Sequence, residues 1–134
     1  NLDYVDSSRI ATIGYCFGGL CSLDLARSGA DLKAAISFHG LLMGLPPEVA
    51  SKDINAKILV CHGYQDPQVP YEQVSDFEKE MAEKKTDWQL HVYGKAMHAF
   101  TNPSANDLNF GTVYDPDAAN RSYVSMKELL EEVF

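Results

Sequence analysis

The fold is decided by residues 9–20, which read RIATIGYCFGGL. Residues 9–15 form a short apolar, β-branched run of the kind found in buried strands. Apolar side chains at helical spacing follow in residues 18–28, and Gly29 stands where a helix commonly ends. The stretch therefore predicts a strand, a tight turn around Cys16 and a helix.

The turn, GYCFGG from Gly14 to Gly19, has the spacing of a nucleophile elbow, GxSxG, with cysteine in place of serine. A residue in a strained strand-to-helix turn needs neighbours without side chains two positions before and after it, and Gly14 and Gly18 meet this need. The positive end of the helix dipole favours a thiolate on Cys16. Glycine-rich turns also bind phosphate groups or are ordinary tight turns, so this motif alone leaves catalysis and a structural role open.

The rest of the chain alternates between strand and helix patterns. Helical spacing of apolar residues predicts a helix between residues 71 and 85, and Asp115-Pro116 supplies an N-cap and a proline first turn for a last helix that reaches Phe134. Short apolar or alternating runs predict three more strands, at residues 34–38, 57–61 and 88–93. This alternation is the signature of a parallel sheet, so the fold class is α/β.

Length and composition indicate a single domain over residues 1–134. Of these 134 residues 46% are hydrophobic and 22% are charged, which is the balance of a globular protein. The net charge of -8, from 11 Lys and Arg against 19 Asp and Glu, repels phosphate backbones and anionic lipids, so we expect no nucleic acid and no membrane as partner. No run approaches the roughly 20 apolar residues of a membrane span, and no secretory leader is recognisable.

The three cysteines cannot all pair within one chain. None lies in a CxxC or zinc-ligand spacing, and the histidines do not combine with acidic residues at metal-ligand spacing. We therefore expect reduced thiols, a cytoplasmic protein and no metal site. Cys21 in the first helix and Cys61 in a strand are expected to be small buried hydrophobic residues.

Two polar residues follow predicted strands at positions suited to chemistry. Residues 62–70, HGYQDPQVP, place Asp66 in a short loop after the third strand, and residues 97–100, MHAF, place His98 after the fourth. The C-terminal ends of parallel strands meet at one edge of a sheet, where α/β proteins bind ligands. The chain order of nucleophile, acid and histidine is that of a catalytic triad beginning at Cys16. An ordinary Asp-Pro turn also explains Asp66.

Together the motifs GYCFGG, HGYQDPQVP and MHAFTNP resemble those of the dienelactone hydrolase family, a branch of the α/β-hydrolase fold that uses a Cys-His-Asp triad. The final helix, residues 117–134, is also similar to the closing helix of that family. The resemblance implies an ester or lactone hydrolase with Cys16 as nucleophile, His98 as base and Asp66 as the acid that orients it, with no cofactor. It covers essentially the whole chain but about the C-terminal half of the family's domain, which implies a partial α/β-hydrolase fold of about four parallel strands with flanking helices.

The resemblance also sets expectations for the rest of the site. In the family a loop from the preceding strands supplies a second oxyanion donor, so the backbone N–H of Phe17 is the donor we expect here. Losing one oxyanion donor typically costs about 10²-fold to 10³-fold in rate, so a non-catalytic fragment or interaction module is the alternative function. Asn102 stands where some members carry an arginine that binds a substrate carboxylate, which favours a broader ester or lactone substrate.

Several residues have both a functional and a structural interpretation. His39 and His62 end strands beside glycines, and each either lines a pocket or caps its strand. We take His39, together with Tyr15 beside the nucleophile, as candidate substrate-binding residues. His91 alternates outward on its strand and is expected to be solvated, whereas Trp88 and the phenylalanines are expected in the core.

The first strand, residues 10–15, has no predicted neighbour on one side. In complete α/β-hydrolases this strand is interior, so here its unpaired N–H and C=O groups and an apolar sheet surface are open. We expect a homodimer, most simply a two-fold one, that covers this edge or the bared sheet face. The alternative is that residues 1–8 or the loop at residues 41–47 fold over it.

Overall fold

The computed structural model describes residues 4–134 and contains a four-stranded sheet with the strand order β1-β2-β3-β4. The strands are β1 (Ala11–Tyr15), β2 (Ala34–Phe38), β3 (Lys57–Gly63) and β4 (Trp88–Tyr93). The helices are α1 (Phe17–Arg27), α2 (Tyr71–Glu83) and α3 (Pro116–Val133). A small antiparallel hairpin, β5 (Asn106–Asp107) and β6 (Thr112–Val113), follows β4. All three strand pairs of the sheet are parallel, so the predicted α/β class with four parallel strands and flanking helices is confirmed.

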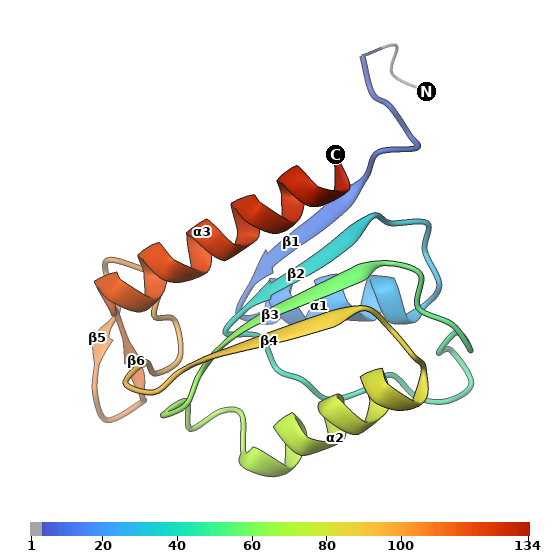
Figure 1. Cartoon of the computed structure of the whole chain (residues 1–134). Coiled ribbons are helices and arrows are strands. Elements are labelled where there is room, and N and C mark those ends of the chain that lie inside the picture. The colour runs from blue at the N-terminus through green and yellow to red at the C-terminus, as the bar shows by residue number, and fades with distance from the viewer. Residues whose placement is uncertain (1–3) are drawn as a thin grey trace.

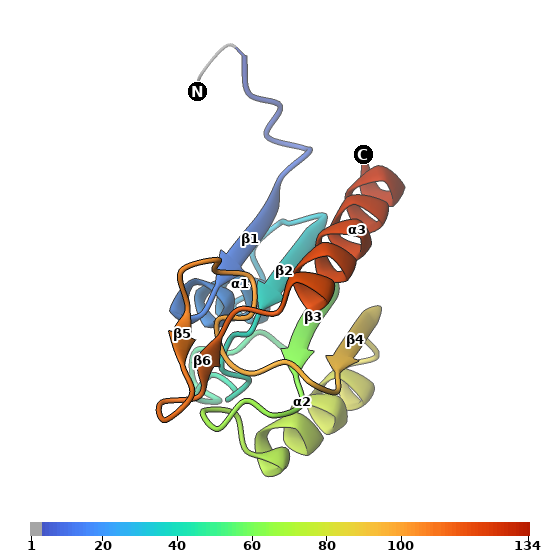
Figure 2. The ribbon, with the colours of Figure 1, turned by 90° about the vertical axis from the view of Figure 1, so that its left-hand side faces the viewer.

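The sheet lies between two helical layers, with α1 and α2 on one face and α3 on the other (Figure 1 and Figure 2). The central strands β2 and β3 are buried at every position except Lys57, because both of their faces are covered and both of their edges are paired. Phe77 of α2 packs in one apolar core with Ile58. Met126 of α3 packs in a second core with Phe38 on the opposite face. A parallel sheet needs such cover on both faces.

The helix ends follow their capping residues. α1 begins after Cys16 and ends before Gly29, which has a positive φ of 84° and donates its N–H back into the last turn. Asp115 caps α3 because its carboxylate accepts a hydrogen bond from the N–H of Ala118. Pro116 takes the first helical position, where a missing N–H costs nothing. The predicted helix ends at these residues are confirmed.

Because the four strands point the same way, the loops that leave them gather at the C-terminal end of the sheet. Cys16 follows β1, His39 follows β2, Asp66 lies just beyond β3 and His98 lies beyond β4. The last two loops approach closely, since a Cβ added to Gly63 would lie 2.7 Å from a backbone oxygen of the loop after β4. Glycine at this position therefore lets the loops that carry Asp66 and His98 meet.

The expected burial of Cys21 and the expected solvation of His91 are both wrong. Cys21 is exposed rather than buried, because it lies two positions from Leu23, which faces the core, and hence nearly opposite it on α1. His91 is half-buried rather than solvated, and its Nδ1 lies 3.0 Å from Oγ of Ser125. The reason is α3, which covers the face of β4 that strand alternation assigned to solvent.

β1 forms one edge of the sheet, and its face on the α3 side is incompletely covered. Ile13 and Tyr15 are 42% and 48% exposed. An open groove runs between the start of β1 and the end of α3, lined by apolar residues that include Ile10, Leu130 and Phe134. Within residues 4–134, β1 therefore pairs with β2 alone and adjoins exposed apolar surface, as expected from the sequence.

Neither the loop at residues 41–47 nor the described part of residues 1–8 covers this surface. The guanidinium of Arg27 on α1 donates hydrogen bonds to the backbone oxygens of Leu42 and Met43, which holds the loop after β2 on the α1 and α2 side. Of residues 1–8, the first three lie outside the described residues, and the others are exposed.

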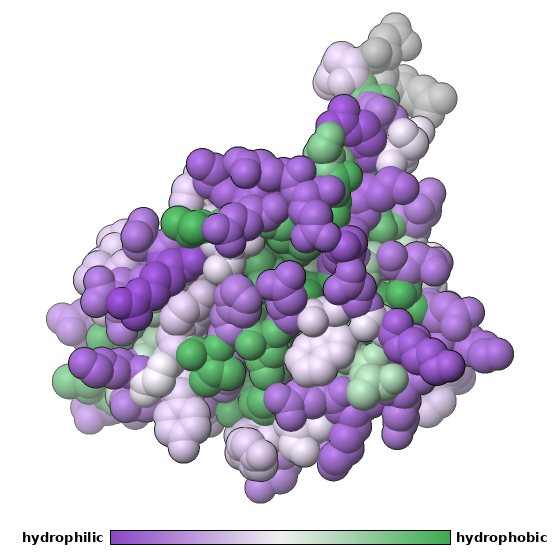
Figure 3. All heavy atoms as spheres, in the orientation of Figure 1, coloured by the Kyte–Doolittle hydropathy of each residue, from purple (hydrophilic) through white to green (hydrophobic). Residues whose placement is uncertain are grey.

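The outer surface of the protein differs in hydropathy between the α3 layer and the β4 edge of the sheet. In Figure 3 the outer face of α3 is hydrophilic, whereas apolar side chains gather between α3 and α2, along the β4 edge. Within residues 4–134 no helix combines the length and the apolar character needed to cross a membrane.

Candidate active site

Cys16 is held in a strained turn between β1 and α1. Its φ of 55° and ψ of -122° lie in a region that residues with a side chain rarely adopt. Its N–H donates to the backbone oxygen of Phe38 at 3.0 Å, and its C=O accepts from the N–H of Gly19 at 2.9 Å. The neighbouring strand and the first helical turn therefore fix the residue that carries the candidate nucleophile.

The glycines around the turn differ in why they are needed. A Cβ on Gly14 would lie 1.8 Å from the backbone oxygen of Gly18, so no side chain fits there. A Cβ on Gly19 would lie 2.5 Å from Oγ of Ser37, whereas one on Gly18 would meet nothing within 4 Å. The expected steric need is present at Gly14, but the expectation for Gly18 is wrong.

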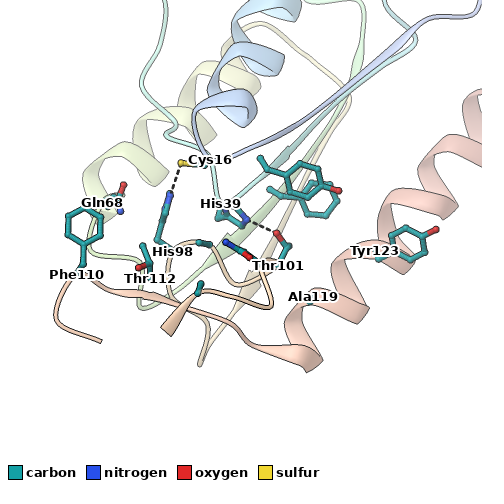
Figure 4. Close-up of a pocket in the computed structure, with 14 residues that line it drawn as sticks. Cys16, His39, Gln68, His98, Thr101, Phe110, Thr112, Ala119 and Tyr123 are labelled. Atoms are coloured by element: carbon teal, nitrogen blue, oxygen red, sulfur yellow. Dashed lines mark hydrogen bonds between the residues drawn. The ribbon is translucent and has the colours of Figure 1, made fainter. Parts of the chain in front are cut away.

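His98 lies within hydrogen-bonding reach of both Cys16 and Asp66, and Figure 4 shows its contact with Cys16. Nε2 of His98 lies 3.0 Å from Sγ of Cys16, and its Nδ1 lies 2.8 Å from Oδ2 of Asp66. The other carboxylate oxygen of Asp66 accepts from the N–H of Gln68 at 2.8 Å. Asp66 and His98 are buried, whereas Cys16 is exposed.

The β5–β6 hairpin supports the histidine. The backbone N–H of His98 donates to the oxygen of Gly111 at 2.9 Å, and its C=O accepts from the N–H of Val113 at 3.1 Å. Gly111 has a φ of 73°, and a Cβ there would lie 2.3 Å from Cγ of Pro67. The hairpin thus joins the His98 loop to the loop of Asp66, which immediately precedes Pro67. The two-residue strands carry no pattern by which the sequence reveals this support.

The surroundings of His98 favour its protonated form. Burial lowers the pKa of His98, but its hydrogen bonds to Asp66 and Cys16, and their charges, outweigh burial and raise the pKa above its ordinary value. His98 is therefore suited to take the proton of Cys16 and hold it.

A cavity of about 800 Å³ opens beside these three residues. Cys16 and His98 line it. The rest of its wall comprises aromatic, small and uncharged polar side chains, among them Phe38, Gln68, Thr101, Asn102, Phe110 and Tyr123. None of its described lining residues is a lysine, arginine, aspartate or glutamate.

The other candidate site residues have mixed positions. Tyr15 and His39 both line the cavity, whereas His62 lines a separate cavity beside α2. Phe17 is 70% exposed, and its backbone N–H lies in the first turn of α1, where N–H groups have no acceptor within the helix. The phenylalanines were expected in the core, but Phe17, Phe110 and Phe134 are exposed, and Phe110 lines the cavity. Within residues 4–134 no three His, Cys, Asp or Glu side chains are grouped to hold a metal ion.

Several known proteins are similar to this chain in sequence or in fold. An uncharacterised protein of Caenorhabditis elegans is 41% identical over 135 residues, covering 97% of this chain and 84% of that protein. A carboxymethylenebutenolidase homolog of Xenopus tropicalis is 30% identical over 102 residues, covering 75% of this chain and 40% of the homolog. The crystal structure of a dienelactone hydrolase-like promiscuous phosphotriesterase from metagenomic libraries is 41% identical, with a TM-score of 0.92, over 97% of this chain and 54% of that one.

The chain therefore spans most of the nematode protein but only about half of the phosphotriesterase and less of the frog homolog. The family model for dienelactone hydrolases matches residues 1–134. By sequence and by fold, this chain belongs to the dienelactone hydrolase family.

Proposed function

We propose that the protein hydrolyses carboxylic esters or lactones through a covalent acyl-enzyme on Cys16. The observation that carries the proposal is the unbroken hydrogen-bonded series from Cys16 through His98 to Asp66, which opens onto a cavity. Such a series is the arrangement in which a histidine activates a nucleophile while a carboxylate orients the histidine.

The steps follow from this arrangement. His98 takes the proton of the Cys16 thiol, and the thiolate attacks the carbonyl carbon to form a C–S bond. The N–H of Phe17 donates to the oxyanion that forms. When the intermediate collapses, the C–O bond breaks and His98 returns the proton to the leaving oxygen, which leaves a thioester. Water then attacks the thioester, again giving a proton to His98, and the acid product leaves as Cys16 regains its proton.

Asp66 acts through His98 rather than on the substrate. Its hydrogen bond to Nδ1 keeps the proton on that nitrogen, so Nε2 faces Cys16 as a base. We therefore expect Asp66→Asn to lower kcat by about 10³-fold to 10⁴-fold, because the amide no longer selects that tautomer.

The cavity favours uncharged substrates. Asn102 lines it, where some members of the family carry an arginine, and none of its described lining residues is a lysine, arginine, aspartate or glutamate. The net charge of -8 also disfavours an anionic substrate. We therefore propose neutral esters or lactones rather than a carboxylate-bearing dienelactone.

Neutral phosphotriesters are a second candidate substrate class. The phosphotriesterase described above is 41% identical to this chain, and a cavity wall whose described residues include no lysine, arginine, aspartate or glutamate suits a neutral triester. In that reaction the thiolate of Cys16 attacks phosphorus, an alkoxide or aryloxide leaves, and water then breaks the P–S bond.

A chromogenic assay tests these proposals. Wild-type protein should hydrolyse p-nitrophenyl acetate faster than the anionic mono-p-nitrophenyl succinate, and paraoxon tests the phosphotriester class. Cys16→Ala should abolish turnover, whereas Cys21→Ala, which removes an exposed thiol elsewhere, should retain it. An inactive wild-type protein would instead support the alternative of a non-catalytic fragment or interaction module. Turnover that survives Cys16→Ala would rule out the covalent mechanism.

The same reasoning extends to partners and compartment. A nucleophilic thiol must stay reduced, so we propose a reducing compartment, the cytoplasm. We also propose a two-fold homodimer that covers the open β1 edge, because an exposed apolar strand edge is a template for pairing with another chain.

A further inference from the structure

His39 is the buried polar residue next to the proposed triad that the mechanism does not use. It directly follows β2 with a positive φ of 40°, and its N–H donates to the backbone oxygen of Cys61 at 2.8 Å. Only 3% of the residue is exposed. The neighbouring strand therefore fixes its backbone, and its ring has a defined place at the cavity wall (Figure 4).

One hydrogen bond connects the His39 ring to the segment that carries His98. Nε2 of His39 lies 2.8 Å from Oγ1 of Thr101, three residues beyond His98, while Nδ1 is buried without a partner among residues 4–134. Thr101 also lines the cavity. The bond thus joins the end of β2 to the loop after β4, two segments far apart in the sequence.

The same ring also contacts the ring of His98. The centroids of His39 and His98 are 5.2 Å apart at an interplanar angle of 65°, an edge-on contact that leaves both nitrogens of His98 to Cys16 and Asp66. Phe100 contacts His39 edge-on as well, at 5.1 Å. His39 therefore supports His98 through ring packing and through the loop that bears it.

We propose that His39 and Thr101 form a latch that holds the His98 ring between Cys16 and Asp66. This inference rests on the proposed function, because it assigns the latch to the same histidine. In it His39 is a positioning residue, which acts through His98 and does not touch the reacting atoms.

The charge state of His39 fits such a role. Burial and the neighbouring His98 lower the pKa of His39 to about 4, although Asp66 opposes this. Its ring otherwise faces the rings of Tyr15 and Phe100 and the hydroxyl of Thr101. At neutral pH His39 is therefore uncharged and does not repel a protonated His98. A neutral amide at the same place should serve, provided that it reaches Thr101.

The reach of the side chain gives a sharp test. In His39→Gln the terminal amide extends about as far as Nε2 of histidine, whereas in His39→Asn it extends about as far as Nδ1, which has no partner. We expect Gln to keep the rate of Cys16 alkylation by iodoacetamide and its pH profile. Asn should lower the rate about 10-fold or more near neutral pH and shift the profile, because small displacements of a reacting pair cost 10-fold to 100-fold.

Thr101 should give the matching result from the other side. Thr101→Val should act like His39→Asn, Thr101→Ser should restore the wild-type profile, and the double variant His39→Asn/Thr101→Val should be no slower than either single variant. The control is His62→Asn, since His62 is also a buried strand-end histidine with an unpartnered Nδ1 but lines a different cavity. Circular dichroism confirms that each variant is folded.

The outcomes separate this inference from the proposed function. The alkylation profile needs no substrate, so an inactive wild-type protein would overturn the hydrolase proposal while the latch is still judged by alkylation. Equal profiles for His39→Gln and His39→Asn would overturn the latch. With an active enzyme, a loss that appears only in KM would also overturn it, because it would make His39 a substrate contact.

Discussion

Both ring nitrogens of His98 are engaged, one with the sulfur of Cys16 and the other with the carboxylate of Asp66. This geometry raises the pKa of His98 despite its burial. Cys16 stands out among the three thiols for a related reason: it is exposed and lies 3.0 Å from Nε2 of His98, whereas Cys21 is exposed with no hydrogen bond to a described histidine and Cys61 is buried. The three thiols therefore form an internal comparison of reactivity.

Cys16 should be alkylated first when iodoacetamide is limiting near pH 7. Its thiolate is supported by His98, whereas burial raises the pKa of Cys61 to about 12. Peptide mapping by mass spectrometry measures the label at each site. Cys21 is the informative control, because it is also exposed to the reagent but has no hydrogen bond to a described histidine. Equal labelling of Cys16 and Cys21 would contradict the assignment of the nucleophile.

The buried, neutral His39 should make the fold sensitive to acid. Its pKa is lowered from 6.5 to about 4, so between these values the unfolded chain binds a proton that the folded chain does not. The free energy of unfolding therefore rises with pH through this window, by on the order of 3 kcal/mol in full. His98 acts in the opposite direction, because its raised pKa stabilises the fold below the unfolded value and this contribution is lost as pH rises through the folded one.

Replacing His39 with glutamine removes the titration of His39 but leaves that of His62 and His98. In urea titrations, the loss of unfolding free energy from pH 7 to pH 4.5 should be smaller for His39→Gln than for wild type, by about 2 kcal/mol. Burial also lowers the pKa of His62, so the His39→Gln variant should still lose part of its unfolding free energy between pH 7 and pH 4.5. Identical losses in wild type and His39→Gln would show that His39 is not held neutral in the folded state.

The sequence located part of the candidate site and missed the rest for a physical reason. Cys16, Asp66 and His98 could be predicted because each follows a strand of a parallel sheet, whose ends must meet. Thr101 and Phe110 could not, because their places depend on how the loop after β4 and the irregular hairpin fold back on the cavity. Neither segment has a periodic pattern.

At the level of elements, the β1–α1 elbow shows how local spacing and tertiary packing differ. The motif predicts small residues at Gly14 and Gly18 equally, yet only the first is crowded, by the backbone of the second. The second crowded position is Gly19, which meets Ser37 of β2. Motif spacing thus finds the turn, whereas the packing of the turn against its own backbone at Gly14 and against β2 at Gly19 decides where a side chain cannot fit.

Alanine at these two positions should have opposite effects. Gly14→Ala should destabilise the protein by about 3 kcal/mol or more and slow Cys16 alkylation, because the added Cβ would lie 1.8 Å from a backbone oxygen that cannot move aside. Gly18→Ala should leave stability unchanged or raise it by up to about 1 kcal/mol, because Gly18 lies in α1 and has open space. Urea denaturation measures both. A severe loss in Gly18→Ala would show that the space around it is not open.

The other elements were predictable where apolar periodicity is strong. β2 and β4 have the predicted ends, and β3 continues two residues further, to Gly63. The errors at Cys21 and His91 arose where a helix face or a covering helix, rather than the local pattern, decides burial. Local sequence therefore predicts the elements better than which of their faces is covered.

For the molecule as a whole, the two edges of the sheet differ in their surroundings. The β1 edge adjoins bare apolar surface on the α3 side, with Ile13 and Tyr15 about half exposed. The backbone oxygen of Ile10 and the N–H of Cys16 bond toward β2, so the alternate residues between them direct their N–H and C=O groups to the open edge. Two copies related by a two-fold axis would pair these edges antiparallel and cover Ile13 and its neighbours.

This arrangement predicts a particle of twice 14.8 kDa at micromolar concentration, measured by light scattering or analytical ultracentrifugation. Ile13→Lys should dissociate it, because it places a charge in the centre of the paired apolar surface. Since each chain carries a net charge of -8, added salt should strengthen the association by screening the repulsion between copies.

The opposite edge supplies the matched control. Val92 on β4 is 48% exposed, close to the 42% of Ile13, so Val92→Lys introduces the same charge at a similarly open position without touching the β1 edge. Dissociation by Ile13→Lys with retention of the dimer in Val92→Lys would place the interface at β1. A wild-type particle of 14.8 kDa at all micromolar concentrations, in low and in high salt, would contradict self-association altogether. Loss of the dimer only in Val92→Lys would move the interface to the β4 edge, where apolar side chains also reach the surface (Figure 3).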